Sequence, residues 1–279
     1  MKKVKILLSV LLVAVLALGV FAACGGNTNN DTNTDPSDAE VKTLIMATNA
    51  SFPPYEFKEG EDFAGIDVEI AGLIAEKLGM KLEIADVEFG TIVGGVQTGK
   101  FDMGMAGMTV TDERKESVNF TDSYAKGVQV VIVPADSDIT VFDDVYESFD
   151  EEGNPTAVKE GIKIGVQQDT TGDIYCSDKA KNWGVGEDNV VRFKTGNDAV
   201  QALVAGKVSA VVIDNEPAKS YVASNEGLKI LDAAYTEEDY AICVAKENTE
   251  LLDNINSALA ALTEEGKVQA IIDKYIPAE

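Results

Sequence analysis

The sequence predicts an α/β protein built from two units, each a largely parallel β-sheet covered by helices. From residue 42 onward, short apolar runs alternate repeatedly with segments of helical periodicity. Such alternation is typical of a parallel sheet with helices on both faces. A composition of 45% hydrophobic and 25% charged residues is that of a globular protein. The folded part, about 240 residues long, has room for one large domain or two of roughly 100–150 residues.

The first unit is predicted to begin with a strand over residues 43–48. A helix follows over 67–78, with Asp67 as its N-cap and Gly79 as its stop, because apolar residues fall on one face of this segment. The pattern then predicts further elements in this order: a strand over 81–87, a short helix over 91–97 and a strand over 101–108.

The second unit is predicted to begin after the β-branched run 128–133. The acidic, turn-rich stretch 136–159 is interpreted as a surface excursion. Four strands are then expected over 163–167, 191–194, 210–214 and 229–231, with helices over 172–182, 198–205 and 217–224. A last strand over 240–245 and helices over 249–263 and 266–275 could return the chain to the first unit.

The N-terminus is predicted to be a targeting segment. A basic start precedes an uncharged apolar run that ends in small residues before Cys24. This junction resembles a bacterial lipobox, which implies that residues 1–23 are a lipoprotein signal peptide and that Cys24 carries a lipid. An ordinary signal peptide is the alternative. Residues 24–40 are small and polar and are expected to form a flexible lipidated tether. The protein would then lie outside the cytoplasm, anchored to the outer face of the cell membrane.

Charge and composition argue against several classes of function. The chain has 48 acidic and 23 basic side chains, a formal net charge of −25, so nucleic acid would be repelled. It contains no histidine, which excludes Ser-His-Asp and Cys-His pairs and imidazole metal sites. Neither a metal nor a cofactor is expected. Cys176 and Cys243 could form a disulfide or remain buried free thiols.

Several motifs in order resemble those of extracellular solute-binding proteins of the polar amino-acid family, the capture components of ABC importers. The strongest is AGMTVTDER at 106–114 followed by VNFTDSY at 118–124. The others are PPYEF at 53–57, GIDVE at 65–69, VQQDTTG at 166–172, ALVAGK at 202–207 and DNEPA at 214–218. No phosphate-cradling G-x-x-x-x-G-K-[ST] motif occurs, so the transporter's ATPase must be another chain.

The resemblance implies a bilobed fold of the type II periplasmic-binding-protein class, with a ligand cleft between two α/β lobes and a hinge crossed twice. The first lobe would comprise residues 41–124 and 241–279, and the second lobe residues 125–240. The hinges would lie near 124–128 and 237–241. Such a protein makes and breaks no covalent bonds, delivers a free amino acid to a permease and is expected to be a monomer. The alternative is an enzyme similar to cyclohexadienyl dehydratases, which would use a carboxylic acid in the cleft as proton donor.

The chemistry of a free amino acid points to a cation and an anion in one site. Arg114 suits bidentate binding of the carboxylate, and Asp214 suits the ammonium group. Gly107 could offer its backbone N–H, the Thr109 hydroxyl could orient the ligand, and Thr171 lies at an expected helix start. As alternatives, Arg114 could cap a helix or pair with an acid such as Glu113, and Asp214 could be an N-cap.

Recognition of the ligand's side chain is expected to involve the loop after the first strand. Matching to the family places Asn49 where relatives that bind basic or amide side chains often carry an acid. A neutral amide there argues against a strong preference for lysine or arginine. Phe52 and Phe89 would flank the ligand, and Met108 and Gln168 complete the predicted site.

Overall fold

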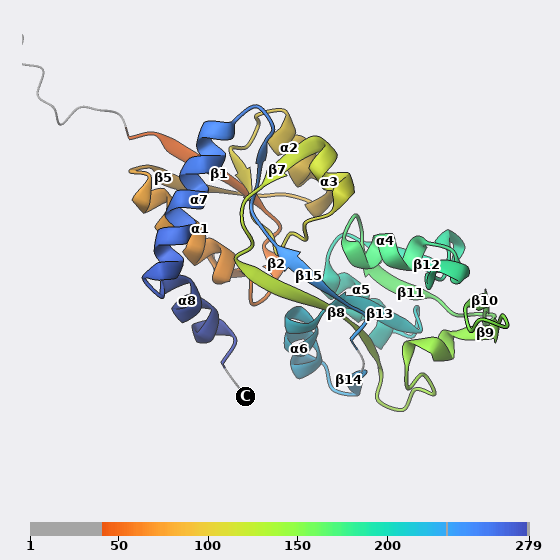
Figure 1. Ribbon diagram of the computed structural model, residues 1–279. Helices are drawn as coiled ribbons and strands as arrows, with labels where there is room; N and C mark the ends of the chain where they lie inside the picture. The colour runs from red at the N-terminus through yellow and green to blue at the C-terminus, as the bar shows by residue number, and fades with distance from the viewer. Residues whose placement is uncertain (1–40, 233, 278–279) are drawn as a thin grey trace, which may run out of the picture. The chain divides into compact units, whose positions relative to one another are not determined.

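The computed structural model describes residues 41–232 and 234–277, which fall within one compact unit (Figure 1). The predicted α/β class is confirmed. Two larger sheets, of five and six strands, carry the fold, and two small antiparallel sheets accompany them. Within the described ranges, no helix is both long and apolar enough to cross a membrane. The predicted signal peptide, lipidated Cys24 and tether lie outside the described residues.

The first sheet has the strand order β5-β1-β6-β16-β7. Strands β5, β1 and β6 are parallel, and β16 runs antiparallel to both β6 and β7. The strands are β1 (Thr43–Thr48), β5 (Lys81–Asp86), β6 (Met103–Gly104), β7 (Val118–Phe120) and β16 (Cys243–Ala245).

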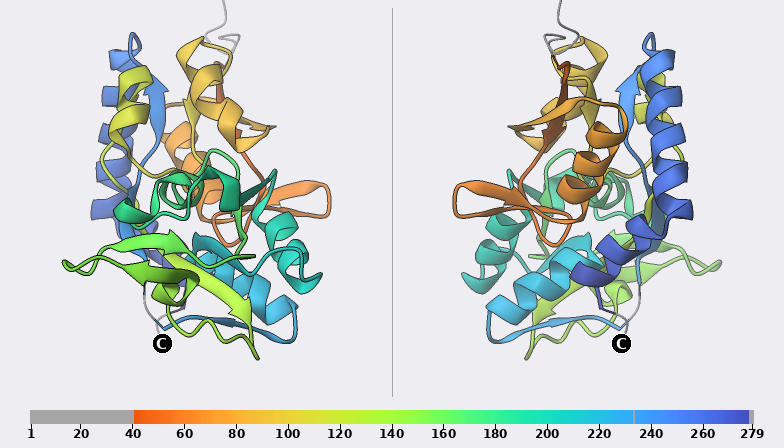
Figure 2. Two further views of the ribbon diagram at one scale, coloured as in Figure 1. Left: turned by 90° about the vertical axis from the view of Figure 1, so that its right-hand side faces the viewer. Right: turned by 90° about the vertical axis from the view of Figure 1, so that its left-hand side faces the viewer.

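Helices cover both faces of this sheet because its strands alternate apolar side chains between them (Figures 1 and 2). On one face Leu44 and Met46 of β1 pack in a core with α1 (Ile66–Lys77), α7 (Thr249–Glu264) and α8 (Lys267–Tyr275). On the other face Ala47 packs with a 3-10 turn η2 (Phe89–Thr91) and with α2 (Ile92–Gln97), next to α3 (Asp112–Ser117). The C-terminal helices α7 and α8 therefore lie in the same helical layer as α1.

The second sheet has the order β12-β11-β13-β8-β14, with β15 also paired to β8. Only β12, β11 and β13 are parallel, so the sheet is mixed and not largely parallel. Its strands are β8 (Ala125–Pro134), β11 (Ile164–Gln167), β12 (Val190–Phe193), β13 (Ala210–Asp214), β14 (Leu228–Ile230) and β15 (Thr236–Tyr240). Helices α5 (Gly196–Val204) and α6 (Asn215–Ser224) pack on one face, and α4 (Thr171–Ser177) on the other.

The chain passes between the two sheets along β8 and β15. These strands pair antiparallel, with Ala125 opposite Tyr240 and Gln129 opposite Thr236. Strand β15 ends at Tyr240 and β16 begins at Cys243, so the single strand predicted over 240–245 is divided between the two sheets. A two-stranded ribbon thus connects the sheets (Figure 1).

Other differences from the expected elements have local causes. The strand predicted over 101–108 is reduced to Met103–Gly104, since only these two residues form ladder pairs with β1 and β16. The stretch 136–159 is more structured than expected: it holds the 3-10 turns of η3 (Phe142–Val145) and a hairpin of β9 (Tyr146–Phe149) and β10 (Pro155–Val158). The helix predicted over 172–182 breaks after Ser177, with short 3-10 turns η4 (Ala180–Asn182) and η5 (Glu187–Asn189) following.

A small antiparallel sheet between β1 and α1 was not predicted. It consists of β2 (Ser51–Phe52), β3 (Glu56–Glu59) and β4 (Asp62–Ala64). After it, α1 begins at Ile66 with Gly65 as its N-cap and no side-chain cap. Asp67 is therefore not the N-cap that the sequence suggested, and its carboxylate is buried among long-range partners instead.

The two described cysteines are free thiols. Both are buried, Cys176 on the inner face of α4 and Cys243 in the core beside α2. Of the two alternatives, the free thiol is the one observed.

Candidate functional site

A cavity lies where the ends of β1, β11 and β13 meet the chain after β6. It is lined by all but two of the predicted site residues, namely Asn49, Phe52, Phe89, Gly107, Thr109, Arg114, Thr171 and Asp214. Glu56, Ala106, Gln167 and Thr170 complete its walls. Its volume of about 20 Å³ accommodates a water molecule and not an amino acid. The walls must therefore separate before a ligand of that size can enter.

Arg114 is a buried cation that forms no ion pair with any residue the structure describes. Thr111 caps α3 by accepting a hydrogen bond from Arg114 N at 3.1 Å, which fixes where the side chain starts. The guanidinium donates to the carbonyl oxygens of Thr109 (2.7 Å) and Asp169 (3.0 Å). Its carbon lies 5.2 Å from the centre of the Phe89 ring.

No carboxylate within residues 41–232 or 234–277 forms an ion pair with Arg114, so the alternative of a pair with Glu113 is not what the structure shows. Burial lowers the pKa of the Arg114 guanidinium, and the negative charge of Glu238 partly offsets this by raising it. A guanidinium nevertheless stays protonated in a protein. A buried unpaired cation beside a cavity favours an anionic ligand group.

Asp214 supplies the opposite charge on another wall. It ends β13 and occupies the N-cap position of α6, as the alternative expected, but its side chain makes no capping hydrogen bond to that helix. The carboxylate accepts a hydrogen bond from the Tyr240 hydroxyl. Burial and the neighbouring Glu238 raise the pKa of Asp214 to about 7, while hydrogen bonds from Tyr240 and Gln129 lower it. A cation entering the cavity would shift Asp214 fully to its ionised form.

Gly107 and Thr109 lie in the cavity wall, but their polar groups point to protein partners. Gly107 has φ +49°, and a β-carbon there would lie 2.9 Å from the Phe52 ring. Its N–H donates to Asp67 Oδ2 at 2.8 Å, so this donor is not free for a ligand as the sequence suggested. The Thr109 hydroxyl donates to Glu238 Oε2 at 2.8 Å and keeps only acceptor capacity.

Thr171 is the first residue of α4, and the preceding Thr170 is the N-cap, accepting from Asp173 N. The Thr171 hydroxyl is within 3.4 Å of Gln129 Nε2. The strand end and helix start expected here are therefore present, with Thr171 and Thr170 both on the cavity wall.

Two predicted site residues lie outside the cavity. Met108 is fully buried in the core beside α2, because the turn after β6 directs its side chain away from the cleft. Gln168 is exposed and bonds to the adjacent Asp169 at 3.2 Å. The residue before it, Gln167, occupies the cavity wall, since neighbouring side chains of an extended chain point to opposite sides.

Gln167 and Asn49 join the two sheets through their amides. Gln167 Nε2 donates to Asn49 Oδ1 at 3.0 Å, and Asn49 Nδ2 donates to the carbonyl of Val87 at 2.8 Å. Further contacts between the same two parts of the chain lie near the cavity. The Tyr221 hydroxyl donates to the Ser51 carbonyl at 2.7 Å, and Lys194 pairs with Glu88 at 2.5 Å. These contacts hold the cavity walls together.

Glu56 is the acidic wall residue that the sequence interpretation missed. Only 1% of its surface is exposed, and its Oε2 atom has no hydrogen-bond partner among the described residues. Burial raises the pKa of Glu56, and the adjacent Asp67 raises it further. The available signal was an acid between Tyr55 and Phe57, inside an otherwise apolar run. An unsatisfied buried oxygen facing a cavity is a natural contact for a donor group of a ligand.

Over residues 41–232 and 234–277, no group of three or more metal-ligating side chains is suited to a metal ion. The acidic residues of the cavity are therefore considered below as partners of organic groups.

Comparison with known proteins identifies the family. Residues 44–278 match the model of bacterial extracellular solute-binding proteins, family 3. The arginine-binding extracellular protein ArtP of Bacillus subtilis (strain 168) is 27% identical, over 96% of this chain and 97% of its own length. A solved structure of an ancestral arginine-binding protein bound to arginine is 36% identical with a TM-score of 0.74, covering 84% of this chain and 98% of that one.

A second structure of an ancestral arginine-binding protein, bound to glutamine, is 35% identical with a TM-score of 0.74, over 86% of this chain and 100% of that one. The two-sheet α/β architecture and the cavity between the sheets are consistent with these matches. The chain belongs to the bacterial extracellular solute-binding proteins of family 3.

Proposed function

We propose that this protein captures a free amino acid outside the cytoplasm and delivers it to the permease of an ABC importer. The observation that carries the proposal is one cavity walled by a buried, unpaired Arg114 and a buried Asp214. A zwitterion presents a carboxylate and an ammonium group one carbon apart. Arg114 would bind the carboxylate and Asp214 the ammonium, so each buried charge gains the partner that it lacks.

Binding would be coupled to closure of two lobes. We assign residues 41–124 and 241–279 to one lobe and 125–240 to the other, with hinges near 124–128 and 237–241, at the end of the β8–β15 ribbon. A cavity of about 20 Å³ must open to admit a ligand, and contacts such as Gln167 to Asn49 must then break. A ligand that touches both lobes binds their closed form better and shifts the population toward it.

Glu56 supports an amino acid with a cationic or amide side chain as the ligand, arginine first. Asn49 provides no charge, but Glu56 also lines the cavity, and its Oε2 atom has no hydrogen-bond partner in the part of the chain that the structure describes. A guanidinium or amide N–H could donate to that oxygen, and Phe52 and Phe89 offer aromatic faces to the rest of the side chain. The names of the similar arginine-binding proteins, and the glutamine-bound ancestral structure, agree with this choice.

A thermal-shift screen of the twenty common amino acids and cystine identifies the ligand, because a molecule that binds only the folded state raises its apparent stability. Calorimetry then tests the site. Arg114→Ala and Asp214→Ala should each reduce affinity by at least about 100-fold, since each leaves a buried charge unpaired. Lys115→Ala on the same helix and Asp253→Ala, both exposed in the structure, serve as matched controls. Unaltered affinity in the Arg114 or Asp214 variant would refute the proposed site.

An enzyme similar to cyclohexadienyl dehydratases is the second candidate, and Glu56 is the residue that supports it. Burial raises the pKa of the Glu56 carboxyl, and a carboxylic acid in a cavity is what a dehydratase requires as proton donor. Turnover of prephenate or arogenate, lost in Glu56→Gln, would favour the enzyme. Binding of an amino acid without turnover favours the transport protein.

We also propose that Cys24 anchors the protein by lipid and that the protein acts as a monomer. The lipobox-like junction before Cys24 supports the anchor. Cys24→Ala should release the protein from the membrane fraction of expressing cells. Light scattering of a chain that starts after Cys24 should give the mass of one copy, with and without ligand.

A further inference from the structure

A second and larger cavity lies on the face of the six-stranded sheet that carries α4. It has a volume of about 620 Å³, within the range of small-molecule sites. Its walls come from β8, η3, the end of α4, η4 and the start of β15. It shares no wall residue with the amino-acid cavity. Nothing in the proposed transport function uses it.

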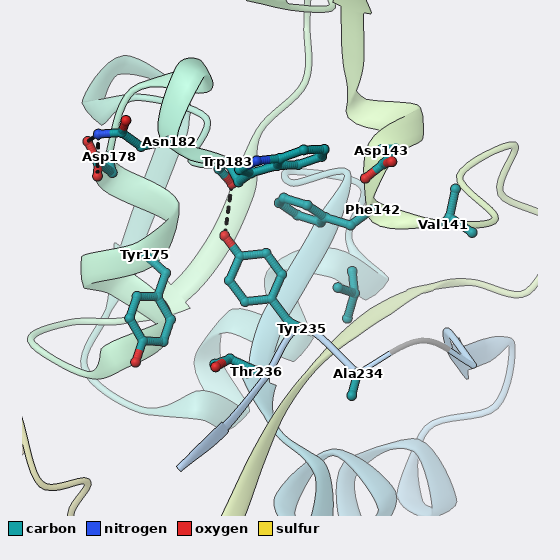
Figure 3. Close-up of a pocket in the computed structure, with 11 residues that line it drawn as sticks. Val141, Phe142, Asp143, Tyr175, Asp178, Asn182, Trp183, Ala234, Tyr235 and Thr236 are labelled. Carbon is teal, nitrogen blue, oxygen red and sulfur yellow. Dashed lines mark hydrogen bonds between the residues drawn. The ribbon is translucent and has the colours of Figure 1, made fainter. Parts of the chain in front are cut away.

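Aromatic rings form much of its wall. Figure 3 shows Trp183, Phe142 and Tyr235 gathered in one group, with Tyr175 set apart from them. Phe142 and Tyr235 meet edge to face with 5.0 Å between ring centres, and Tyr175 lies 6.1 Å from Tyr235. Trp183 is 40% exposed although it is a large apolar side chain.

Hydrogen bonds and ring contacts outside the cavity hold these aromatic side chains in place. The hydroxyls of Tyr235 (2.8 Å) and the buried Tyr146 (2.7 Å) both donate to the Trp183 carbonyl, and Tyr146 also contacts the rings of Phe142 and Trp183. Trp183 itself has φ +65°, a conformation that a residue other than glycine rarely adopts. The Tyr235 hydroxyl is therefore already engaged as a donor to the protein.

The charged groups of the wall are both acidic. Asp178 is held by the Asn182 side chain (3.0 Å) and the Lys179 N–H (2.7 Å), and Lys179 and Lys181 are near enough to lower its pKa. Asp143, beside Phe142 in Figure 3, has no ion-pair partner in the described part of the chain. Among the described residues, no lysine or arginine lines the cavity.

We propose that this cavity is a second ligand site, which binds a small organic ammonium ion with an apolar body. Aromatic faces attract cations, and the Asp143 carboxylate adds the opposite charge at the rim. The apolar body of the ligand would cover Phe142 and Trp183, which water otherwise contacts. A free amino acid fits less well than a simple amine, because no cationic group is present in these walls for its carboxylate.

Phenethylammonium is a suitable probe, and 3-phenylpropionate is its anionic counterpart of similar size. Trp183 is the only tryptophan in the chain, so its fluorescence reports on this cavity directly. The measurement uses Arg114→Ala to keep the amino-acid cavity out of the signal, and ligand-observed NMR provides a second readout. We expect saturable binding of the ammonium ion below about 10 mM, and at least fivefold weaker binding of the anion.

Two variants test the assignment. Asp143→Asn should weaken binding of phenethylammonium about fivefold, and Phe142→Leu, which keeps an apolar side chain but removes the π face, about threefold. Asp136→Asn, an exposed acid outside the cavity, is the matched control and should leave binding unchanged. Equal binding of the cation and anion, no effect of Asp143→Asn, or no saturable binding by either method would overturn the proposal.

Discussion

Binding of the amino acid should weaken as pH falls below 7, because Asp214 must be ionised to hold the ammonium group. Burial and Glu238 raise the pKa of this carboxyl to about 7 in the ligand-free protein. A bound cation stabilises the ionised form and lowers that pKa. Binding therefore releases a proton at acidic pH, and affinity is greatest above pH 7.

The size of the effect follows from the ionised fraction. With a pKa of about 7, roughly 90% of Asp214 is ionised at pH 8, roughly 9% at pH 6 and about 1% at pH 5. Since only the ionised fraction binds well, the apparent affinity should fall about tenfold from pH 8 to 6 and about 100-fold from pH 8 to 5. The ligand's own carboxylate and ammonium groups titrate outside this window.

Calorimetry at half-unit intervals from pH 5 to 8.5 measures this profile, and runs in two buffers of different ionisation enthalpy count the released protons. Tyr240→Phe is the diagnostic variant. The Tyr240 hydroxyl donates to Asp214 and lowers its pKa, so its removal should move the midpoint of the profile to higher pH without changing the shape of the site. An affinity that is constant from pH 5 to 8, or a midpoint that Tyr240→Phe leaves in place, would refute the role of Asp214.

Three further outcomes are expected. Asp214→Asn should raise the free energy of unfolding of the ligand-free protein above pH 7 by up to about 4 kcal/mol, measured by urea unfolding. The pKa of Asp214 is raised from 3.8 to about 7 on folding, so the folded state loses stability as pH rises between these two values. The amide of asparagine does not titrate, so the variant avoids this loss. Gly107→Ala should lower the free energy of unfolding by about 1–3 kcal/mol, because φ is +49° and the new β-carbon would meet Phe52; an unchanged urea midpoint would contradict this. Burial raises the pKa of the Cys176 and Cys243 thiols, so Ellman's reagent should label them only in the unfolded protein, and rapid labelling under native conditions would show that they are accessible.

Much of the fold could be predicted where a segment has a strong local pattern. Strands β1 and β13 occupy the predicted residues, 43–48 and 210–214, and α7 differs from its prediction by one residue at its end. The two strands are continuous, mostly apolar runs, and α7 is long enough for its helical periodicity to show. The strands β2 to β4 and β7 have two to four residues each and are defined by pairing with distant segments, so no local pattern predicts them.

The kinds of residue in the candidate site were predictable, but their orientation was not. Arg114 and Asp214 stand out because a zwitterion requires both charges, and the structure brings them to one cavity. Gln167 and Gln168 could not be told apart, because every residue of β11 is buried and the alternation that reveals a strand's inner face is missing. Asp67 looked like an N-cap because its true partners, Gly107 and Tyr124, are at least 40 residues away in the sequence.

The position of β16 has a consequence for how the chain folds during synthesis. This strand separates β6 from β7, and β7 has no other partner in its sheet. The ribosome must therefore pass residue 245 before the first half of the polypeptide can close its own sheet, although β1 and β6 emerge much earlier. Every strand of the six-stranded sheet except β15 is complete at Ile230, so most of that sheet can assemble sooner. We expect the middle of the sequence to fold first, while its N-terminal strands wait for the last quarter of the chain.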